Sequence, residues 1–530
     1  MNRAGPMMFT TWKSFLLVLA PVWIALVGFY LGEDVHCNRF IPPSIDLLTL
    51  DTRGISNLLQ NGSVAMVQLV EEYLHRIALD NVEGLGLRPI LSLTSRDLLL
   101  REARQLDERS ANMAPFEGNM ATEAKLGMPA SAGAYALENA SATSDAFLIA
   151  KAREAGLLLM SLADSIRDND ISPSWSSLGG ETLSPYDCQH PCGSSGGPVV
   201  AVAAGFAPVA LGSETQGSIS CPASFTALYG FKTSTGLLSR AGILPSSTSF
   251  DSPAVFAKSA WDIASMLSVV SGPDVNDPIT LEGAPYAKNF LPNLTRSWSD
   301  FRIGIVDRPW FWEINDGFSG DQEERDEEEK GAVIVDNVRM PSADLSNTEV
   351  PSLMGRIIRY EMKPGTEKFL QSLSGTNIKT LVDLVKRNQE HPDLSGSKKY
   401  PGEKYLERAP RETISDKEYE AALAQAHKLG VEEGLELIFD KYDLDAIVAP
   451  AWTQMSIYAA WLGSPTATVP LGQYKNKKPY GLGFVGRRFS DEQLLQIMNL
   501  YEMTFPPSLT PKRMHWKRWE KLLPAAWTCQ

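Results

Sequence analysis

The chain has 530 residues, of which 44% are hydrophobic and 21% are charged. This composition is ordinary for a globular protein and excludes the disordered and collagen-like classes. A net charge of -14 at pH 7 argues against nucleic-acid binding, which depends on clustered Lys and Arg to neutralise phosphates. We therefore expect no nucleic-acid partner, and a small molecule or a peptide instead.

The N-terminal residues 1–32 form an apolar leader. Arg3 and Lys13 precede an uncharged apolar run over residues 14–32, which is the layout of a secretory signal or a signal anchor. A membrane span needs roughly 20 apolar residues, so this run could just cross a bilayer. No clean Ala-x-Ala cleavage site follows it. The sequence predicts entry to the secretory pathway and leaves open a secreted product, a membrane-anchored one, or a buried core helix.

Sequons and cysteines bear on the same compartment. Three Asn-x-Ser/Thr sequons begin at Asn61, Asn139 and Asn293 and are compatible with a glycoprotein. Five cysteines are too few for a disulfide scaffold, and their odd number predicts at least one free or intermolecular thiol. Cys188 and Cys192 have the spacing of a metal half-site, but no second pair accompanies them at ligand spacing. We expect no metal.

The segment after the leader predicts helices followed by strands. Ser63 is placed to cap a helix whose apolar residues recur every three or four positions. A second amphipathic helix is predicted over residues 95–109. A third begins near Asp145 and leads through Gly156 into an apolar strand. Helix followed by strand is the α/β pattern.

The second half of the chain contains an acidic run and several predicted core strands. Residues 321–330, DQEERDEEEK, are predicted to form a solvated surface excursion. One long helix is expected over residues 417–442, followed by a buried strand over residues 445–451. Two further core strands are predicted near Thr466 and Tyr480. No internal repeat of fixed period is present, so one compact domain is the simplest account.

Two Gly/Ser-rich turns lie between Pro191 and Lys232, separated by an apolar segment. The first turn contains Ser194 and Ser195, and the second contains Ser218. Such turns let backbone amides approach a ligand closely, and adjacent N–H groups can hold an anion. A phosphate loop is disfavoured because the Gly-Lys-Ser/Thr ending is absent. The Gly-x-Ser-x-Gly elbow of other serine hydrolases is not matched at Ser218 either.

At these turns the chain resembles the amidase signature family. The resemblance comprises the GSSGG turn, the later serine in QGSIS, and the segments CPASFTALYGFK, GMPASAGAYAL, WSSLGGETLSPY, DAIVAPA, TATVPLG and YGLGFVGR. It covers most of the chain after the leader. It implies an α/β fold, with a single amidase-signature domain over residues 45–528 and a mixed central sheet flanked by helices on both faces. It also implies hydrolysis of a small-molecule amide at its C–N bond, without a cofactor.

The resemblance assigns roles to individual residues. Ser218 matches the nucleophile that forms an acyl-enzyme, and Ser194 matches the bridging serine on a cis peptide that passes the proton onward. Ser195 is expected to be structural. A tetrahedral oxyanion formed at the nucleophile needs fixed N–H donors. The oxyanion loop is matched by the backbone amides of Thr215, Gln216, Gly217 and Ser218.

The resemblance to the family fails at the residue that should act as the general base. A serine hydroxyl is a weak nucleophile until a base removes its proton, and this family uses a neutral lysine for that purpose. The family places the lysine at the end of an apolar strand of the type Gly-Ile-Pro-Val-Leu-Leu-Lys-Gly-Asn-Ile-Ala-Thr. Here residues 113–122 read MAPFEGNMAT. Glu117 therefore occupies the lysine position, and the apolar strand before it is missing or shortened.

Three explanations of this break remain open. Glu117 acts as a substitute base if burial raises its pKa, or Lys125 reaches the site. Alternatively, the chain is catalytically inactive and acts as a binding or scaffold protein on the same fold. The third explanation is a misjudged exon boundary that removed a strand from the sequence. Retained Ser194 and Ser218 favour an enzyme, whereas the missing lysine favours the inactive protein. Ammonia transfer within a glutamine-dependent complex is disfavoured by the leader.

Overall fold

The computed structural model describes residues 45–108, 116–118, 126, 128–157, 159–163, 174–307, 331–345, 348–396, 399, 407, 414–505 and 509–511. The leader, the acidic run over residues 321–330, Lys125 and the end of the predicted domain after residue 511 lie outside these ranges. Within the described ranges, no helix is both long enough and apolar enough to cross a membrane.

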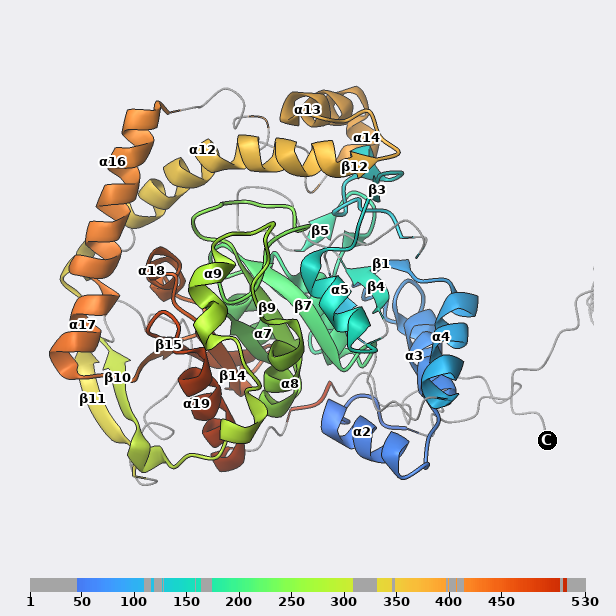
Figure 1. The fold of residues 1–530 in the computed structure, drawn as a ribbon, viewed down its shortest axis with the longest axis horizontal. Helices are drawn as coiled ribbons and strands as arrows, with labels where there is room; N and C mark the ends of the chain where they lie inside the picture. Colours follow the sequence, from blue (N-terminus) through green and yellow to red (C-terminus); the bar gives the residue numbers. More distant parts are fainter. Residues whose placement is uncertain are drawn as a thin grey trace, which may run out of the picture. The chain divides into compact units, whose positions relative to one another are not determined.

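Eleven strands of the described chain form one sheet (Figure 1). In order across the sheet they are β1 (Ile90–Leu93), β4 (Leu159–Ala163), β2 (Phe116–Gly118), β7 (Val209–Glu214), β9 (Ser252–Ala257), β8 (Tyr229–Lys232), β14 (Thr466–Gln473), β15 (Pro479–Gly486), β13 (Ala446–Pro450), β10 (Arg302–Val306) and β11 (Val333–Val338). β2 runs parallel to β4 and β7, and β10 runs parallel to β11 and β13. The remaining pairs are antiparallel, so the predicted mixed sheet is confirmed.

Helices surround this sheet. They are α2 (Thr52–Gln60), α3 (Met66–Asp80), α4 (Arg96–Glu108), α5 (Phe147–Glu154), α6 (Gly196–Ala203), α7 (Ser220–Phe225), α8 (Ala260–Val270), α9 (Thr280–Gly283), α12 (Glu349–Ser372), α13 (Leu381–Glu390), α14 (Pro392–Ser395), α16 (Asp416–His427), α17 (Leu435–Tyr442), α18 (Met455–Leu462) and α19 (Asp491–Thr504). Two short two-stranded sheets, β3 (Ser141–Ala142) with β12 (Leu373–Ser374) and β5 (Trp175–Ser176) with β6 (Gly180–Glu181), lie outside the main sheet.

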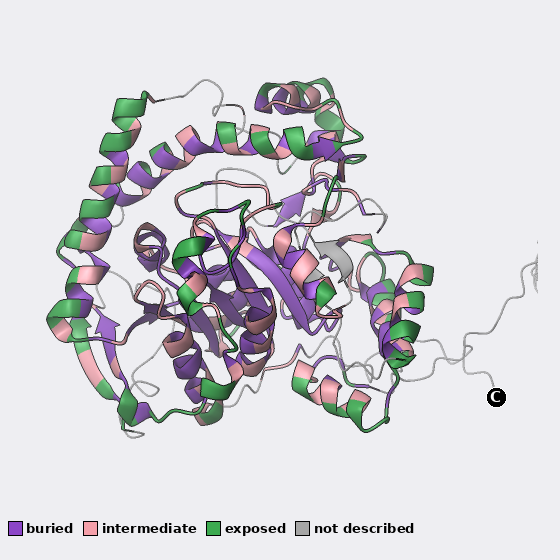
Figure 2. Cartoon of the chain, in the orientation of Figure 1, coloured by how far each residue is buried: buried purple, intermediate pink, exposed green. Residues whose placement is uncertain are grey.

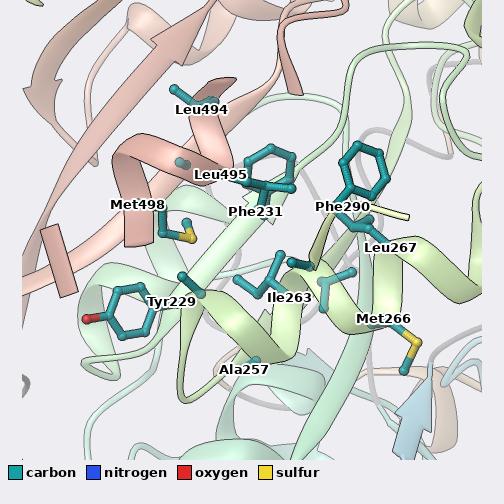
Figure 3. Close-up of a cluster of buried hydrophobic side chains, with 14 of the residues drawn as sticks. Tyr229, Phe231, Ala257, Ile263, Met266, Leu267, Phe290, Leu494, Leu495 and Met498 are labelled. Atoms are coloured by element: carbon teal, nitrogen blue, oxygen red, sulfur yellow. The ribbon is translucent and has the colours of Figure 1, made fainter. Parts of the chain in front are cut away.

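The central strand β9 shows why helices are needed on both faces. Its side chains alternate between the two faces, as strand geometry requires. Val255 and Ala257 join a buried cluster with α8 and α19, part of which is drawn in Figure 3. Ala254 and Phe256 join a second buried cluster with α3, α4 and α6. Figure 2 shows the central strands of the sheet as buried. The predicted α/β fold with both faces covered is confirmed.

The start of α3 differs from the prediction. The helix begins at Met66, and its N-cap is Ala65, which makes no side-chain capping bond; Ser63 is therefore not the cap. The first helical amides are satisfied from α4 instead. The Asp107 carboxylate accepts the N–H of Met66 at 2.6 Å and that of Val67 at 3.2 Å. A tertiary contact thus replaces the local cap that the sequence indicated.

The single helix predicted over residues 417–442 is wrong, because the segment is interrupted. α16 ends at His427, a π-helical turn follows over Lys428–Glu432, and α17 begins at Leu435. At Gly434 an added Cβ would lie 2.3 Å from the carbonyl oxygen of Gly430. The backbone therefore turns where no side chain fits. The helix-to-strand pair α5 and β4 and the strands β13, β14 and β15 are where the sequence predicted them.

Buried polar contacts attach the first described segment to α8. Asp262 is 0% exposed, and its Oδ1 accepts both the N–H of Thr52, at 2.9 Å, and the Thr52 hydroxyl. Its Oδ2 has no hydrogen-bond partner among the described residues, and burial raises the pKa of Asp262 to about 7. Lys258 donates to the carbonyl oxygens of Leu47 and Leu50, and burial lowers the pKa of this lysine to about 8.

We predict that Asp262→Asn flattens the pH dependence of stability between about pH 4 and pH 7. The folded-state pKa of Asp262 lies above the value of about 3.9 for an unfolded aspartate, so the folded protein binds the extra proton in this window. The contribution of Asp262 to the free energy of unfolding is therefore fully present below about pH 4 and is lost as the pH rises through about 7. For a single group, a pKa that differs by one between the folded and unfolded states changes this free energy by about 1.4 kcal/mol.

Urea unfolding at about pH 4.5 and about pH 7.5 measures this effect. The exposed Asp393→Asn variant serves as a control, because it should follow the wild type at both values. Parallel pH profiles for the wild type and Asp262→Asn would contradict the prediction.

Candidate functional site

Both predicted catalytic serines lie in turns that lead into helices. Ser194 lies two residues before α6, and Ser218 lies two residues before α7. The peptide bond between Gly193 and Ser194 is cis, as the resemblance implied. Both serines are half-buried. The second turn follows directly from the last residue of β7, Glu214.

Ser195 joins the two turns. Its side chain is 0% exposed, and its hydroxyl donates to the carbonyl oxygen of Ser213 at 3.0 Å and accepts the N–H of Ser213 at 3.3 Å. Its own N–H donates to the carbonyl oxygen of Ser218 at 3.3 Å. These bonds hold the first turn against the second, which is the structural role expected for Ser195.

Glu214 closes the loop that contains the predicted nucleophile. Its buried carboxylate Oε2 accepts the N–H of Ile219 at 2.6 Å and the N–H of Ser220 at 3.1 Å. These amides lie at the N-terminus of α7, where a negative charge is stabilising. The Glu214 carboxylate, which precedes residues 215–218, therefore binds the backbone that directly follows them. Sequence reasoning missed Glu214, although an acidic residue directly before the turn was a usable signal.

A disulfide links the same two turns. Cys192 and Cys221 are bonded, with their Cα atoms 5.9 Å apart. Cys192 lies two residues before Ser194, and Cys221 lies three residues after Ser218. The sequence indicated no such pair, because it could not show that the two turns meet. The bond removes Cys192 as a thiolate ligand, and no group of three or more His, Cys, Asp or Glu residues in the described chain is placed to hold a metal ion.

The loop between Glu214 and Ile219 has unused backbone donors. None of the described residues accepts a hydrogen bond from the amide N–H groups of Thr215, Gln216, Gly217 and Ser218. Gly217 has a φ of 69°, and an added Cβ there would lie 3.1 Å from Cζ3 of Trp452. Glycine is therefore required at this position. Adjacent free N–H groups in a turn form a site that can stabilise an anion.

Asp251 fixes the first residue of this loop. The Thr215 hydroxyl donates to Oδ1 of Asp251, and Oδ2 accepts the N–H groups of Ser246 at 2.7 Å and Ser247 at 2.8 Å. Burial raises the pKa of Asp251 to about 6. The carboxylate accepts all three bonds. Sequence reasoning also missed this residue, whose only signal is its position directly before the apolar strand β9.

The structure describes little of the two candidate bases. Lys125 lies outside the described residues, and only the backbone of Glu117 is described. Glu117 is in β2, a three-residue strand, and is paired with Ala210 of β7. Ser213, whose backbone binds Ser195, lies three residues after Ala210. Three residues span about 10 Å along a strand. A three-residue strand is thus present at this position, and the backbone of Glu117 lies before the level of Ser213.

Two lysines with lowered pKa values have other roles. Lys232 is 0% exposed, its Nζ donates to the carbonyl oxygen of Ser464 at 2.7 Å, and burial lowers its pKa to about 8. The ammonium group of Lys258 is engaged by the carbonyl oxygens of Leu47 and Leu50. Both lysines therefore satisfy backbone acceptors within the fold.

The fold is α/β, and Ser218 lies in a turn whose amides bond to none of the described residues; comparisons with known proteins identify the class. The model of the amidase family matches residues 69–495. A probable amidase of Arabidopsis thaliana is 28% identical, over 82% of this chain and 86% of the relative. The native peptide amidase of Stenotrophomonas maltophilia is 29% identical, with a TM-score of 0.79 over 87% of this chain and 98% of its own.

A further solved structure, an amidase family protein of Bacillus anthracis, is 25% identical, with a TM-score of 0.80 over 93% of this chain and 97% of its own. The chain belongs to the amidase family, a family of amide hydrolases.

We predict that the two neighbouring serines of the first turn respond differently to alanine. Ser195→Ala leaves the half-buried N–H and carbonyl oxygen of Ser213 without their side-chain partner, which should lower the free energy of unfolding by about 1–3 kcal/mol. Ser194→Ala removes a half-buried hydroxyl that has no bond to a described residue and should change stability by less than about 0.5 kcal/mol. Urea unfolding of both variants tests this, and equal losses would contradict it.

Proposed function

We propose that this protein hydrolyses the C–N bond of a carboxamide through an acyl-Ser218 intermediate. One observation carries the proposal: the Ser194 turn and the Ser218 turn are held together by Ser195, and none of the described residues accepts a hydrogen bond from the amides of residues 215–218. Membership of the amidase family supports the reaction class. The expected substrate is a small-molecule amide, and the name of the peptide amidase relative adds peptide amides to those worth testing.

The geometry supports a sequence of steps. Oγ of Ser218 attacks the amide carbonyl carbon, and the resulting oxyanion is stabilised by the N–H groups of residues 215–218. Ser194 passes the proton of Ser218 onward and returns it to the departing nitrogen, so the C–N bond breaks and an ester to Ser218 remains. Water then attacks this ester by the same route, releasing the carboxylic acid and regenerating Ser218.

The weak point of this scheme is the final proton acceptor. The register of β2 argues against Glu117, because its backbone lies about 10 Å along the strand before the level of Ser213. We propose that the chain as written lacks the terminal base of the relay. The second candidate function, an amidase-fold protein that binds amides without hydrolysing them, is favoured by this same shortened strand.

We predict that the chain as written hydrolyses amides very slowly, because removing one member of a catalytic relay costs several orders of magnitude. Replacing residues 113–117 with Gly-Ile-Pro-Val-Leu-Leu-Lys should raise the rate by roughly 10² or more. Glu117→Lys alone should restore little, since a catalytic group must be held to within about 0.5 Å. Release of ammonia from simple carboxamides and from a peptide amide measures the rate.

Controls separate the possible outcomes. Ser218→Ala in the restored chain should abolish both turnover and labelling by a fluorophosphonate probe. Labelling that survives this substitution would remove Ser218 from the mechanism. Ordinary turnover by the unmodified chain would show that the relay is intact, and Glu117→Gln and Lys125→Met would then identify the base. A restored chain that folds but neither turns over nor is labelled would favour the binding protein.

We also propose that the protein enters the secretory pathway and is either secreted or anchored in the membrane through its leader. The apolar run over residues 14–32 motivates this, and the sequon residues Asn61, Asn139 and Asn293 are all exposed. The Cys192–Cys221 disulfide supports it further, because disulfides persist in oxidising compartments and are rare in the cytosol.

We predict that the protein expressed in a eukaryotic host loses mass on deglycosidase treatment and co-sediments with membranes unless the leader is cleaved. Alkylation without a reductant should leave Cys192 and Cys221 unmodified, because both sulfur atoms are in the disulfide. Asn→Gln at each sequon provides the control for glycan attachment. A full-length soluble cytosolic product without glycans would contradict the proposal.

A further inference from the structure

A network of hydrogen bonds connects the predicted oxyanion loop, residues 215–218, to α12 and α16. It begins where the neighbouring strands β7 and β9 end their pairing, at Glu214 and Ser252. The next residue after β7 is Thr215, and the residue before β9 is Asp251; the Thr215 hydroxyl donates to this carboxylate. Because Asp251 also accepts the N–H groups of Ser246 and Ser247, it joins the loop to the segment 246–251.

A second carboxylate, that of Glu361, continues this network of hydrogen bonds. Glu361 of α12 is 3% exposed, and its oxygens accept the hydroxyls of Ser247 and Ser249 together with the N–H of Ser249 at 3.2 Å. The hydroxyl of Tyr419, in α16, donates to Glu361 at 2.5 Å. Ser247 is the link between the two carboxylates, since its N–H binds Asp251 and its hydroxyl binds Glu361.

Packing and charge favour a fixed geometry along this network of hydrogen bonds. At Gly365 of α12 an added Cβ would lie 2.8 Å from Cγ of Pro245, so the helix sits directly on the segment that carries Asp251. The Arg240 guanidinium donates to the carbonyl oxygen of Thr248, between the two carboxylates, and is paired with Asp277. Hydrogen bonds to ionised acceptors are shorter and stronger than neutral ones. The segment therefore has little freedom to shift.

We propose that Asp251 and Glu361 are positioning residues that fix the oxyanion loop, residues 215–218, relative to α12 and α16. The inference rests on the proposed function, in which the amides of this loop stabilise the oxyanion. Donors of that kind must lie about 2.7–3.1 Å from the oxyanion, so a small displacement of Thr215 weakens several of them together. Helices far away in sequence thus set the geometry beside Ser218.

The positioning claim is tested first without any ligand. Crystal structures of Asp251→Asn and Glu361→Gln should show the backbone of residues 215–218 displaced by roughly 0.5 Å or more, the tolerance of a catalytic constellation. Tyr360→Phe is the matched control: its ring stacks on Tyr419 at 4.0 Å, but its hydroxyl donates to Asp416 and not to Glu361. An unmoved loop in both carboxylate variants would overturn the proposal.

The consequence for binding is tested with phenylboronic acid, which forms a tetrahedral adduct with a nucleophilic serine. Asp251→Asn, Glu361→Gln and Thr215→Val should weaken its binding by roughly tenfold or more, and Thr215→Ser should restore it. Tyr360→Phe should leave the affinity unchanged. A merely structural network would instead lower the melting temperature with no change in boronate affinity well below it, and that result would overturn the proposal.

Failure of the proposed function has a different signature. Boronate binding to the unmodified chain that survives Ser218→Ala, or is absent altogether, would count against Ser218 as a nucleophile. The loop position in the crystal structures would still decide whether Asp251 and Glu361 act as positioning residues. Because Glu361→Gln keeps the shape of a glutamate and one acceptor oxygen, a folded variant is expected for this comparison.

Discussion

The contact between two turns from different parts of the chain is the constraint on which the site depends. Ser195 binds both the backbone of Ser213 and the carbonyl oxygen of Ser218, so the first turn cannot move without the second. The Cys192–Cys221 disulfide provides a covalent link across the same contact. The two half-buried serines, Ser194 and Ser218, thereby lie in turns that are bonded to each other.

Carboxylates next to the ends of strands accept further hydrogen bonds around this contact. Glu214 ends β7 and accepts two amides at the start of α7, and Asp251 precedes β9 and accepts the Thr215 hydroxyl. Glu361 extends the same arrangement to α12 and α16. In each case the negative charge is compensated by several donors, which is the condition for keeping a buried carboxylate. None of the described residues accepts a hydrogen bond from the amides of residues 215–218.

The short strand β2 preserves the sheet, but its length bears on whether the proposed relay has a base. β2 has three residues yet still pairs with β4 and β7, so the sheet remains continuous across this position. Continuity of the sheet depends only on backbone pairing, whereas delivery of a base depends on the length and register of the strand. The family membership of the chain is compatible with either an active or an inactive protein.

Much of this protein was determined by the local sequence. The helix over residues 95–109, the strands of the DAIVAPA and TATVPLG segments, and both serine turns are read from apolar periodicity and glycine content, since these are local properties of the chain. The helix over residues 417–442 was mispredicted because its interruption at Gly434 shows only in the backbone geometry of the folded segment.

Tertiary structure alone decided which distant groups meet. The sequence could not place Cys192 beside Cys221, Asp107 at the start of α3, or Asp251 and Glu361 around Ser247. Such pairs are separated by tens to more than a hundred residues, and no periodic pattern encodes which strand lies next to which. The sequence by itself therefore determined the chemistry of the two turns, whereas the order of strands in the sheet decided which charges hold those turns in place.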